Sequence, residues 1–249
     1  MPIGGSFYPD FQCSLVRGLT AYYKLEEASG IRVDAFGSND LGPQGAPGNI
    51  TGIYNSAVAL SSSLTQLLAA SDNAAISFNQ NSFTLAAWFY MDSKVGDDRN
   101  ILAKTVNGGV PTTEYALFWT PSALKFRIGD GSSVTAVSSG VDPDLATWYF
   151  MIGWHDAVGD TINVQINNGA VNSSAWSTGS QDTASPLEIG RGGSSGAALF
   201  NGRIDEVGLW GRVLNAQERS DLYNGGIGNT YSAASSCIPK DPESTVSTF

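Results

Sequence analysis

The chain has 249 residues, of which 29 are glycine, 42% are hydrophobic and only 14% are charged. This composition excludes a coiled coil and a largely disordered chain, and it is typical of a domain with many strands and tight turns. The formal net charge of −10 excludes a basic nucleic-acid binder, because affinity for nucleic acid comes mainly from lysine and arginine side chains that neutralise phosphates.

The sequence shows neither a membrane span nor a signal peptide. No apolar run approaches the ~18 residues of a transmembrane helix. Met1 is not followed by the basic segment and short apolar core of a secretory signal. We therefore expect no membrane insertion. We also expect either a trimmed piece of a secreted protein or a protein that leaves its cell by lysis, as virion components do.

The N-terminal quarter of the chain predicts an arm, a strand and a long loop. Residues 1–17 mix proline, glycine and aromatic residues without a helical or strand period, which indicates an N-terminal arm. A strand is expected over residues 18–26. Residues 28–53 are rich in glycine and predict a loop region. Short strands are then expected near residues 57–60 and 65–70.

Two long strands follow. Residues 82–91 have apolar side chains on both faces, which predicts a central strand covered on both sides. In residues 147–155, large apolar side chains alternate onto one face, namely Trp148, Phe150, Ile152 and Trp154. Further strands are expected over residues 100–104, 114–120, 124–129, 161–167, 187–190 and 203–210.

One helix is expected near the C-terminus. Asn215 is placed to cap it, Glu218 completes a capping box, and the glycines at 225–226 end it. Residues 232–249 are rich in serine and contain two prolines, which indicates an extended C-terminal tail. These elements together predict an all-β fold, a two-sheet antiparallel sandwich with one short C-terminal helix.

Four segments carry a recognisable order of landmarks. They are GLTAYYKLE over residues 18–26, SFTLAAWF over 82–89, the VQINNG hairpin over 164–169 and GRIDEVGLW over 202–210. This order resembles the laminin-G-like, concanavalin A-like jelly-roll family, the lectin/glucanase superfamily. The resemblance implies a jelly-roll domain over residues 18–231 in which the first and last strands are neighbours. That adjacency would bring Cys13 and Cys237 within reach of a disulfide, and two free thiols are the alternative.

The residues argue against catalysis. Related jelly-roll glycosidases carry a Glu-x-Asp-x-x-Glu strand, because retaining hydrolysis needs two carboxylates about 5 to 5.5 Å apart. In this chain Asp205 is expected to stand alone on its face, with Arg203 and Val207 in the positions that carboxylates would need. His155, the single histidine, is expected to be a solvated residue at a strand end. We therefore expect that the protein is not an enzyme.

A structural calcium ion is expected between the first loop and the last strand. Calcium takes oxygen ligands from carboxylates and carbonyls. If the first and last strands pair, Asp34 and Asp205 come together, and a buried carboxylate needs a partner or a metal. The resemblance supports this site, since many family members hold calcium in this region. The alternative is that Asp205 binds backbone amides or Arg203.

A ligand surface is expected around aromatic side chains near loops. Sugar rings stack their apolar faces on aromatic rings, while amide side chains hydrogen-bond to the hydroxyl groups. The expected members of this surface are Tyr115, Trp119, Gln165 and Trp176. The alternative is that the tryptophans pack under a loop or against a partner subunit.

These features favour a non-enzymatic structural or adhesive protein. The more concrete prediction is a virion surface protein, such as a phage capsid decoration or fibre-associated subunit, with glycan binding. The two terminal segments would dock on other virion or capsid proteins within an oligomeric assembly, because short apolar tails gain order on binding. The alternative is a secreted carbohydrate-binding module from a larger glycan-active enzyme or adhesin, which would bind cell-surface glycans.

Overall fold

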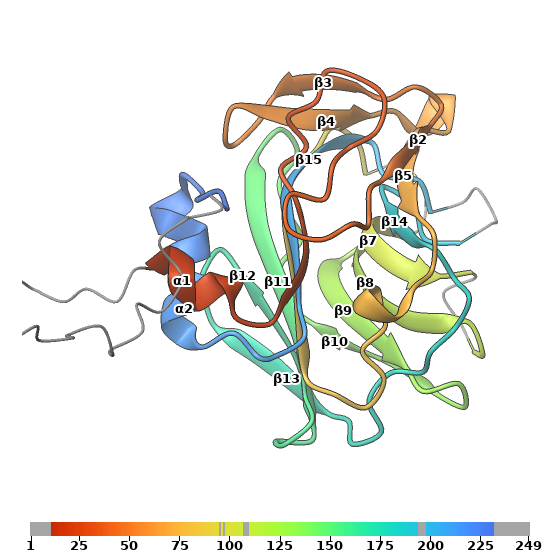
Figure 1. Cartoon of the computed structure of the whole chain (residues 1–249), viewed down its shortest axis with the longest axis vertical. Helices are drawn as coiled ribbons and strands as arrows, with labels where there is room; N and C mark the ends of the chain where they lie inside the picture. The colour runs from red at the N-terminus through yellow and green to blue at the C-terminus, as the bar shows by residue number, and fades with distance from the viewer. Residues whose placement is uncertain (1–10, 95, 97, 107–109, 194–197, 232–249) are drawn as a thin grey trace, which may run out of the picture.

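The computed structural model describes residues 11–94, 96, 98–106, 110–193 and 198–231. Two antiparallel sheets pack face to face in a jelly-roll sandwich, which confirms the predicted all-β fold (Figure 1). One sheet contains, in order, β13 (Val171–Ala175), β12 (Thr161–Ile166), β11 (Trp148–Asp156), β6 (Phe83–Met91), β15 (Gly202–Trp210), β4 (Ser56–Leu60) and β3 (Gly48–Thr51), with β1 (Leu19–Tyr23) also paired to β15. The other contains β10 (Val134–Ser138), β9 (Ala123–Gly129), β8 (Thr113–Thr120), β7 (Arg99–Thr105), β14 (Leu187–Ile189), β5 (Leu67–Ala70) and β2 (Gly42–Gln44).

Two short α-helices, α1 (Phe11–Val16) and α2 (Ala216–Tyr223), accompany the sheets, together with the 3-10 turns η1 (Ser62–Leu64), η2 (Ala74–Ile76) and η3 (Asn224–Gly226). The predicted capping box of α2 is confirmed. The Asn215 side chain accepts from the Glu218 amide at 3.0 Å, and the Asn215 amide donates to the Glu218 carboxylate at 2.8 Å. Within the described part of the chain, no helix has the length and apolar character needed to cross a membrane.

The pairing of the first and last strands is confirmed. β1 runs antiparallel to the C-terminal half of β15, with Tyr23 opposite Val207. β15 pairs on its other side with β6, which lies between β15 and β11. The strand that is apolar on both faces, β6, therefore occupies a central position, as its pattern predicts.

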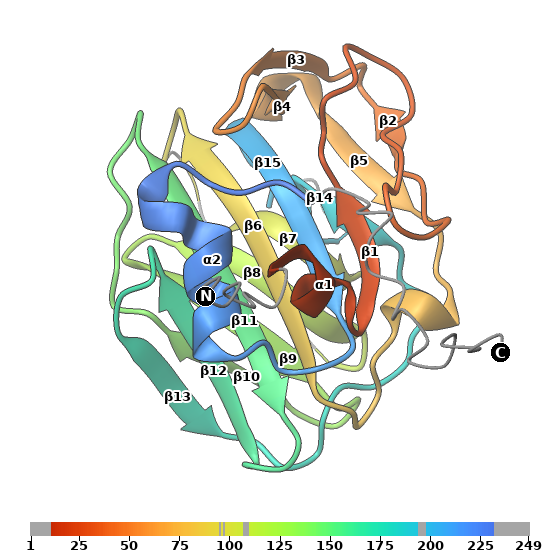
Figure 2. The same cartoon turned by 60° about the vertical axis from the view of Figure 1, so that its left-hand side comes forward.

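Alternating side chains build two layers of core. The inward face of β6 contributes Phe83, Leu85, Ala87 and Phe89 to the core between the sheets. The opposite face of the same sheet carries a second apolar cluster that contains Trp88, Trp154 and Trp210. Helices α1 and α2 lie over this outer face (Figure 2) and add Leu15 and Leu222 to the cluster. This cover explains why β6 and β11 are apolar on both faces.

The last part of the predicted N-terminal arm, which spans residues 1–17, packs on the sandwich. Residues 11–16 form α1, and the Leu15 side chain is 3% exposed in the outer cluster. The Leu15 carbonyl accepts a hydrogen bond from the buried Trp210 indole at 2.8 Å. A helix of one and a half turns leaves no periodic signal, so only tertiary packing identifies it.

The disulfide prediction lies outside the described residues. Cys13 belongs to the α1 backbone, but its side chain is not described, and Cys237 falls in the segment 232–249. The pairing of Cys13 with Cys237 therefore stays a prediction.

Three strands at sheet edges were not predicted from the sequence. The region 28–53, predicted as a loop, contains β2 and β3, and residues 134–138 form β10. β2 and β3 are short, each of their residues is exposed, and each strand pairs on only one side. Glycine and proline are tolerated in such edge strands, which therefore read as loops in the sequence.

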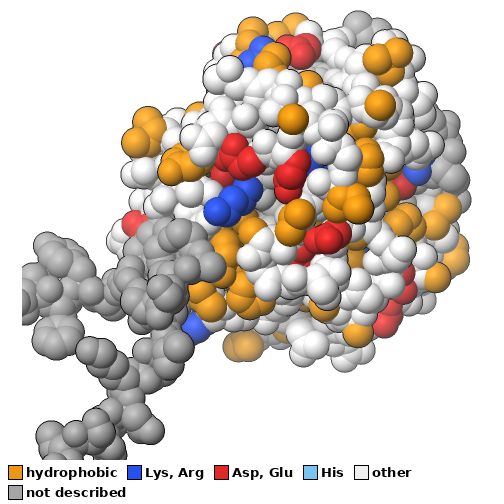
Figure 3. Space-filling model, turned by 45° about the horizontal axis from the view of Figure 1, so that its top comes forward, with side chains coloured by type: hydrophobic (Ala, Val, Ile, Leu, Met, Phe, Trp, Pro, Cys, Tyr) orange, Lys and Arg blue, Asp and Glu red, His pale blue; other side chains and the backbone are white. Residues whose placement is uncertain are grey.

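Charge is sparse on the folded surface as well. On the face shown in Figure 3, uncharged side chains and backbone cover most of the area. Acidic and basic side chains form small separate groups there, and this face carries no broad basic patch. The view agrees with the low charged fraction of the sequence.

Candidate functional site

The expected ligand surface does not form around the strand β8. Tyr115 is fully buried between the sheets, and its hydroxyl donates to the Ile76 carbonyl at 2.6 Å. Trp119 is 2% exposed and its indole donates to Asp142 at 2.8 Å. The reason is the two-residue period of a strand, which puts Tyr115, Leu117 and Trp119 on the same inward face. Neither aromatic ring can stack on a ligand from solvent.

Gln165 is also wrongly predicted as a surface residue. It lies on β12 and is only 6% exposed. Its amide nitrogen donates to the Gly169 carbonyl at 2.8 Å, and its oxygen accepts from Arg219 of α2 at 2.9 Å. Gln165 points away from the core between the sheets, but α2 covers this face of the sheet, and no local signal in β12 reveals the cover.

Trp176 is the one member of the expected set that lines an open hollow. It follows β13 directly, and its backbone amide donates to the Asp160 carbonyl at 2.8 Å. Its indole N–H donates to the Gly179 carbonyl at 2.7 Å, which fixes the ring orientation. The hollow has a volume of about 540 Å³, and its lining consists of Asp130, Ser133, Asp160, Ala175, Trp176, Ser177 and Thr178. These seven residues are called the Trp176 hollow.

Three loops from both sheets meet at the hollow. Asp130 and Ser133 belong to the β9–β10 turn, Asp160 to the β11–β12 hairpin, and Trp176 to the chain that leaves β13. The edge strands β10 and β13 lie next to each other, so their loops reach the same rim of the sandwich (Figure 1, Figure 2). The hollow is thus built where the edges of the two sheets meet.

The hollow carries negative charge. The Asp130 carboxylate accepts from the Ser133 and Ser132 amides at 2.7 and 2.8 Å and from the Thr178 hydroxyl at 2.8 Å. These hydrogen bonds, the Ser133 amide first, hold the pKa of Asp130 below its usual value, so this group is ionised at neutral pH. Asp160 is exposed at the hollow with a left-handed backbone, φ 50°.

The arrangement combines an aromatic face with hydrogen-bonding groups. A half-buried indole offers an apolar surface, and the carboxylates and hydroxyls beside it accept and donate hydrogen bonds. This chemistry suits a neutral molecule with one apolar face and several hydroxyl groups. An anionic ligand would be repelled by Asp130 and Asp160.

Asp34 organises the loop that follows β1. Its two oxygens accept from the backbone amides of Tyr22, Phe36, Gly37 and Asn39 and from the Asn39 side chain, at 2.9 to 3.1 Å. Asp205 accepts from the amides of Ile53 and Tyr54 at 2.9 and 3.2 Å and from the Glu206 amide at 2.9 Å. The amide alternative considered for Asp205 is therefore observed, and calcium at Asp34 and Asp205 stays a prediction without support from their contacts.

Asp205 does not stand on the face expected for it. In β15, Glu206 has a left-handed backbone with φ 46°, and Glu206 and Val207 together oppose Ala87 of β6. This β-bulge shifts the alternation by one residue. Asp205 then lies opposite Trp88 on the outer face, while Val207 and Leu209 face the core between the sheets.

The bulge places two buried carboxyl groups side by side. Asp205 and Glu206 are 0% and 3% exposed, and the Tyr22 hydroxyl donates to Glu206. Burial, with the neighbouring Glu206 as a second cause, raises the pKa of Asp205 to about 8. Burial likewise raises the pKa of Glu206 to about 7. Glu206 was not among the predicted site residues, although an Asp-Glu pair in an apolar strand is itself an unusual pattern.

His155 is buried rather than solvated. It is 1% exposed, its Nδ1 lies 3.0 Å from the Asn81 carbonyl, and its ring contacts Phe83. The loop that precedes β6 covers the end of β11, which the strand pattern alone does not show. Nothing in this arrangement presents the imidazole to a substrate.

Side chains that could hold a metal ion are grouped elsewhere. Among the described residues, one set of His, Cys, Asp or Glu side chains is close enough to hold an ion, and it consists of Asp72, Glu114 and Asp182. Asp34 and Asp205 do not belong to such a set in the described part of the chain. The three acids come from distant parts of the sequence, so no spacing motif identifies them.

Comparisons with known proteins agree with the fold. The laminin G family model described as "Concanavalin A-like lectin/glucanases superfamily" matches residues 63–218. No curated protein matches the chain in sequence.

Solved structures with the same fold come from toxins and from an enzyme. The binding domain of Paraclostridial Mosquitocidal Protein 1 has a TM-score of 0.69 and 16% identity, covering 83% of this chain and 52% of that chain. Botulinum neurotoxin type C, whose cell entry depends on two ganglioside molecules, has a TM-score of 0.65 and 12% identity, covering 85% and 52%. This chain thus spans about half the length of those two toxin chains.

A third similar structure is matched over nearly its whole length. It is domain 4 of AbnA, a GH43 extracellular arabinanase from Geobacillus stearothermophilus, in complex with arabinotriose. The TM-score is 0.63 and the identity is 14%, covering 82% of this chain and 97% of that chain. At these identities the likeness shows the fold alone.

Proposed function

Because the chain belongs to the concanavalin A-like lectin/glucanase superfamily, we propose that it is a non-catalytic domain that binds carbohydrate in the Trp176 hollow. The observation that carries the proposal is the half-buried indole of Trp176 beside Asp130, Asp160 and the hydroxyls of Ser177 and Thr178. A sugar ring would stack on the indole, and its hydroxyls would donate to the carboxylates. The negative charge of the hollow favours a neutral glycan.

The similar structures support the carbohydrate part of the proposal. Domain 4 of AbnA is a separate domain of a glycan-degrading enzyme and was obtained with arabinotriose. Botulinum neurotoxin type C interacts with gangliosides, and a related neurotoxin binding domain is in complex with SialylT. These neighbours are binding domains or binding proteins, which also favours a role without catalysis. Cell-surface glycans are therefore the partners that we propose, with arabino-oligosaccharides as a second class to test.

The localisation of this domain, on a virion surface or as a secreted module, stays a prediction from the sequence. The similarity to a domain of an extracellular arabinanase favours the secreted alternative. The virion surface role, with its capsid partners and oligomeric assembly, stays a prediction that these similarities do not address.

Replacing Trp176 tests the proposed site. The parent protein should bind at least one neutral oligosaccharide, such as an arabino-oligosaccharide, in isothermal titration or on a glycan array. Trp176→Ala should weaken this binding about tenfold or more, since loss of an aromatic pair contact costs about 1 kcal/mol beyond the buried area. The matched control is Tyr54→Ala, which removes an aromatic side chain that is 40% exposed in the β3–β4 hairpin.

A second variant separates binding from folding. Ser177 is exposed in the hollow, so Ser177→Arg should block the ligand while the melting temperature stays unchanged. Equal glycan binding by the parent, Trp176→Ala and Ser177→Arg would show that the glycan binds outside the Trp176 hollow. Absence of binding to any glycan, with the parent fully folded, would contradict the proposed function.

A further inference from the structure

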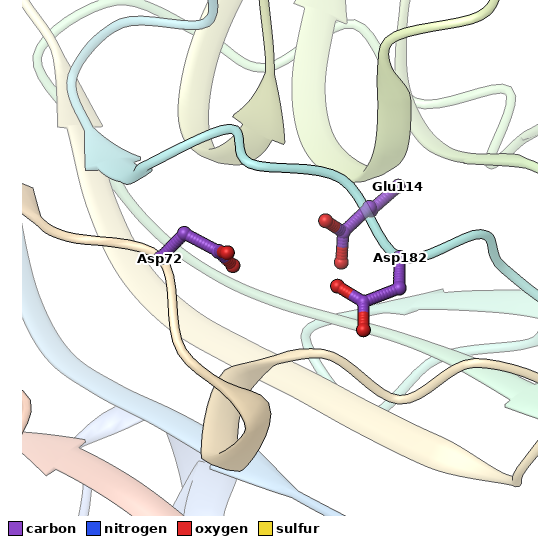
Figure 4. A group of neighbouring side chains, drawn as sticks. All are labelled: Asp72, Glu114 and Asp182. Atoms are coloured by element: carbon purple, nitrogen blue, oxygen red, sulfur yellow. The ribbon is translucent and has the colours of Figure 1, made fainter.

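Three carboxylates meet at one end of the sandwich, outside the Trp176 hollow. Asp72 follows β5, Glu114 is the second residue of β8, and Asp182 lies in the connection from β13 to β14. One oxygen from each group lies within 4.8 Å of the others. Figure 4 shows the three carboxylates turned toward one another. Asp72 and Asp182 are exposed, whereas Glu114 is fully buried.

A lysine neutralises only part of this charge. The buried Lys104 ammonium donates to Asp72 at 2.6 Å, to one oxygen of Glu114, and to the Thr183 carbonyl at 3.1 Å. An ammonium group has three hydrogens to donate, so these contacts use all of them. Three carboxylates therefore face one ammonium, and further positive charge would be favourable.

One oxygen of Glu114 has no hydrogen-bond donor. Its Oε1 accepts from Lys104 and from the Thr183 amide and hydroxyl, both at 2.8 Å. Its Oε2 is buried and has no partner. Buried polar atoms are nearly always satisfied, and an unpaired carboxylate oxygen is among the most costly exceptions. Figure 4 shows the Glu114 carboxylate turned toward Asp72 and Asp182, and an unpaired oxygen on this carboxylate is what a bound cation would satisfy.

We propose that Asp72, Glu114 and Asp182 bind a calcium ion, with Glu114 Oε2 as the buried ligand and water in the remaining positions. Calcium prefers six to eight oxygen ligands in flexible geometry, and carboxylates from two loops and from the start of β8 contribute to such a set. Magnesium demands tighter octahedral geometry and is expected to bind more weakly. The solvent-exposed Asp72 and Asp182 leave a path for entry.

The ion would tie three parts of the fold together. Asp182 lies next to Gln181, whose amide donates to the Gly129 carbonyl at 2.9 Å and whose side chain donates to the Thr113 carbonyl at 2.8 Å. Calcium bound at Asp182 would add a link from this connection to the end of β5 and to β8. This proposal does not depend on carbohydrate binding by the domain.

Calcium titration of the full chain after treatment with EDTA tests the site. The parent should bind one ion in isothermal titration, and its melting temperature should rise in millimolar calcium, because binding to the native state stabilises it by mass action. Asp182→Asn removes an exposed ligand, so it should weaken calcium binding about tenfold or more while the melting temperature in EDTA stays that of the parent. Asp144→Asn, which removes another exposed acid, is the matched control and should bind like the parent.

Two results would overturn the proposal. One is a parent protein that shows neither heat of binding nor a thermal shift in millimolar calcium. The other is calcium binding that is equal in the parent and in Asp182→Asn, which would place the ion at other carboxylates, with Asp34 and Asp205 as the first to examine.

Discussion

Raising the pH from 5 to 8.5 should destabilise this protein, and the buried pair Asp205 and Glu206 should account for most of the loss. In the folded state their pKa values are about 8 and about 7, whereas both groups titrate near pH 4 when unfolded. Between these values the folded state holds protons that the unfolded state has released. The stability that these two protons contribute is therefore fully present below pH 4, falls as the pH rises above 4, and is lost once the pH has passed through 7 to 8, with a slope of roughly 1.4 kcal/mol per pH unit for each proton.

Glu206→Gln tests this assignment. The Gln oxygen can accept from the Tyr22 hydroxyl as Glu206 does, and the side chain stays neutral at every pH. The variant should show a flatter dependence of unfolding free energy on pH, and it should be more stable than the parent at pH 8.5. Asp144→Asn, an exposed acid, should keep the parent slope. Urea unfolding at several pH values measures the unfolding free energy of each variant. If this free energy depends on pH in Glu206→Gln as it does in the parent, the assignment is contradicted.

The fold could be predicted from local patterns because each strand carries its own signal. Alternation placed Trp148, Phe150, Ile152 and Trp154 on one face, and all four lie on the outer face beneath the helices. Asn215 and Glu218 predict the start of α2, and the capping box that they form is present in the structure. What failed were features without a period, namely the short α1 and the edge strands β2 and β3, which tertiary contacts define.

The site was harder to predict because it depends on which faces are covered. Trp176 is singled out by the sequence because it stands in a polar segment, and its role as a ligand-binding residue stays a prediction. Tyr115 and Trp119 were predicted to be exposed because they lie near loops. Both face the core, because they share the inward face of the strand β8. The bulge at Glu206 reversed the expected face of Asp205, and a bulge of this kind depends on one backbone angle that the sequence does not reveal.

Removing residues 1–16 should cost several kcal/mol of stability, because α1 belongs to the folded domain. Leu15 packs in the cluster with Tyr22, Trp88 and Trp210, and its burial contributes about 1.5 to 3 kcal/mol. Its carbonyl is also the acceptor for the buried Trp210 indole. Without that acceptor the N–H would be left unpaired, at a further cost of about 1 to 3 kcal/mol.

The same truncation distinguishes packing within the domain from docking on a partner. Arg212, which pairs with Glu218 of α2, also donates to the Ser14 carbonyl at 2.8 Å, so the loss of α1 should loosen α2 as well. We expect a lower urea midpoint and an unchanged oligomeric state by light scattering. Leu15→Ala in the full chain should reproduce about 2 to 4 kcal/mol of the loss without removing the backbone acceptor. A truncated domain as stable as the parent, but no longer assembling with other copies or proteins, would instead show that the N-terminal segment serves an assembly, as its composition first suggested.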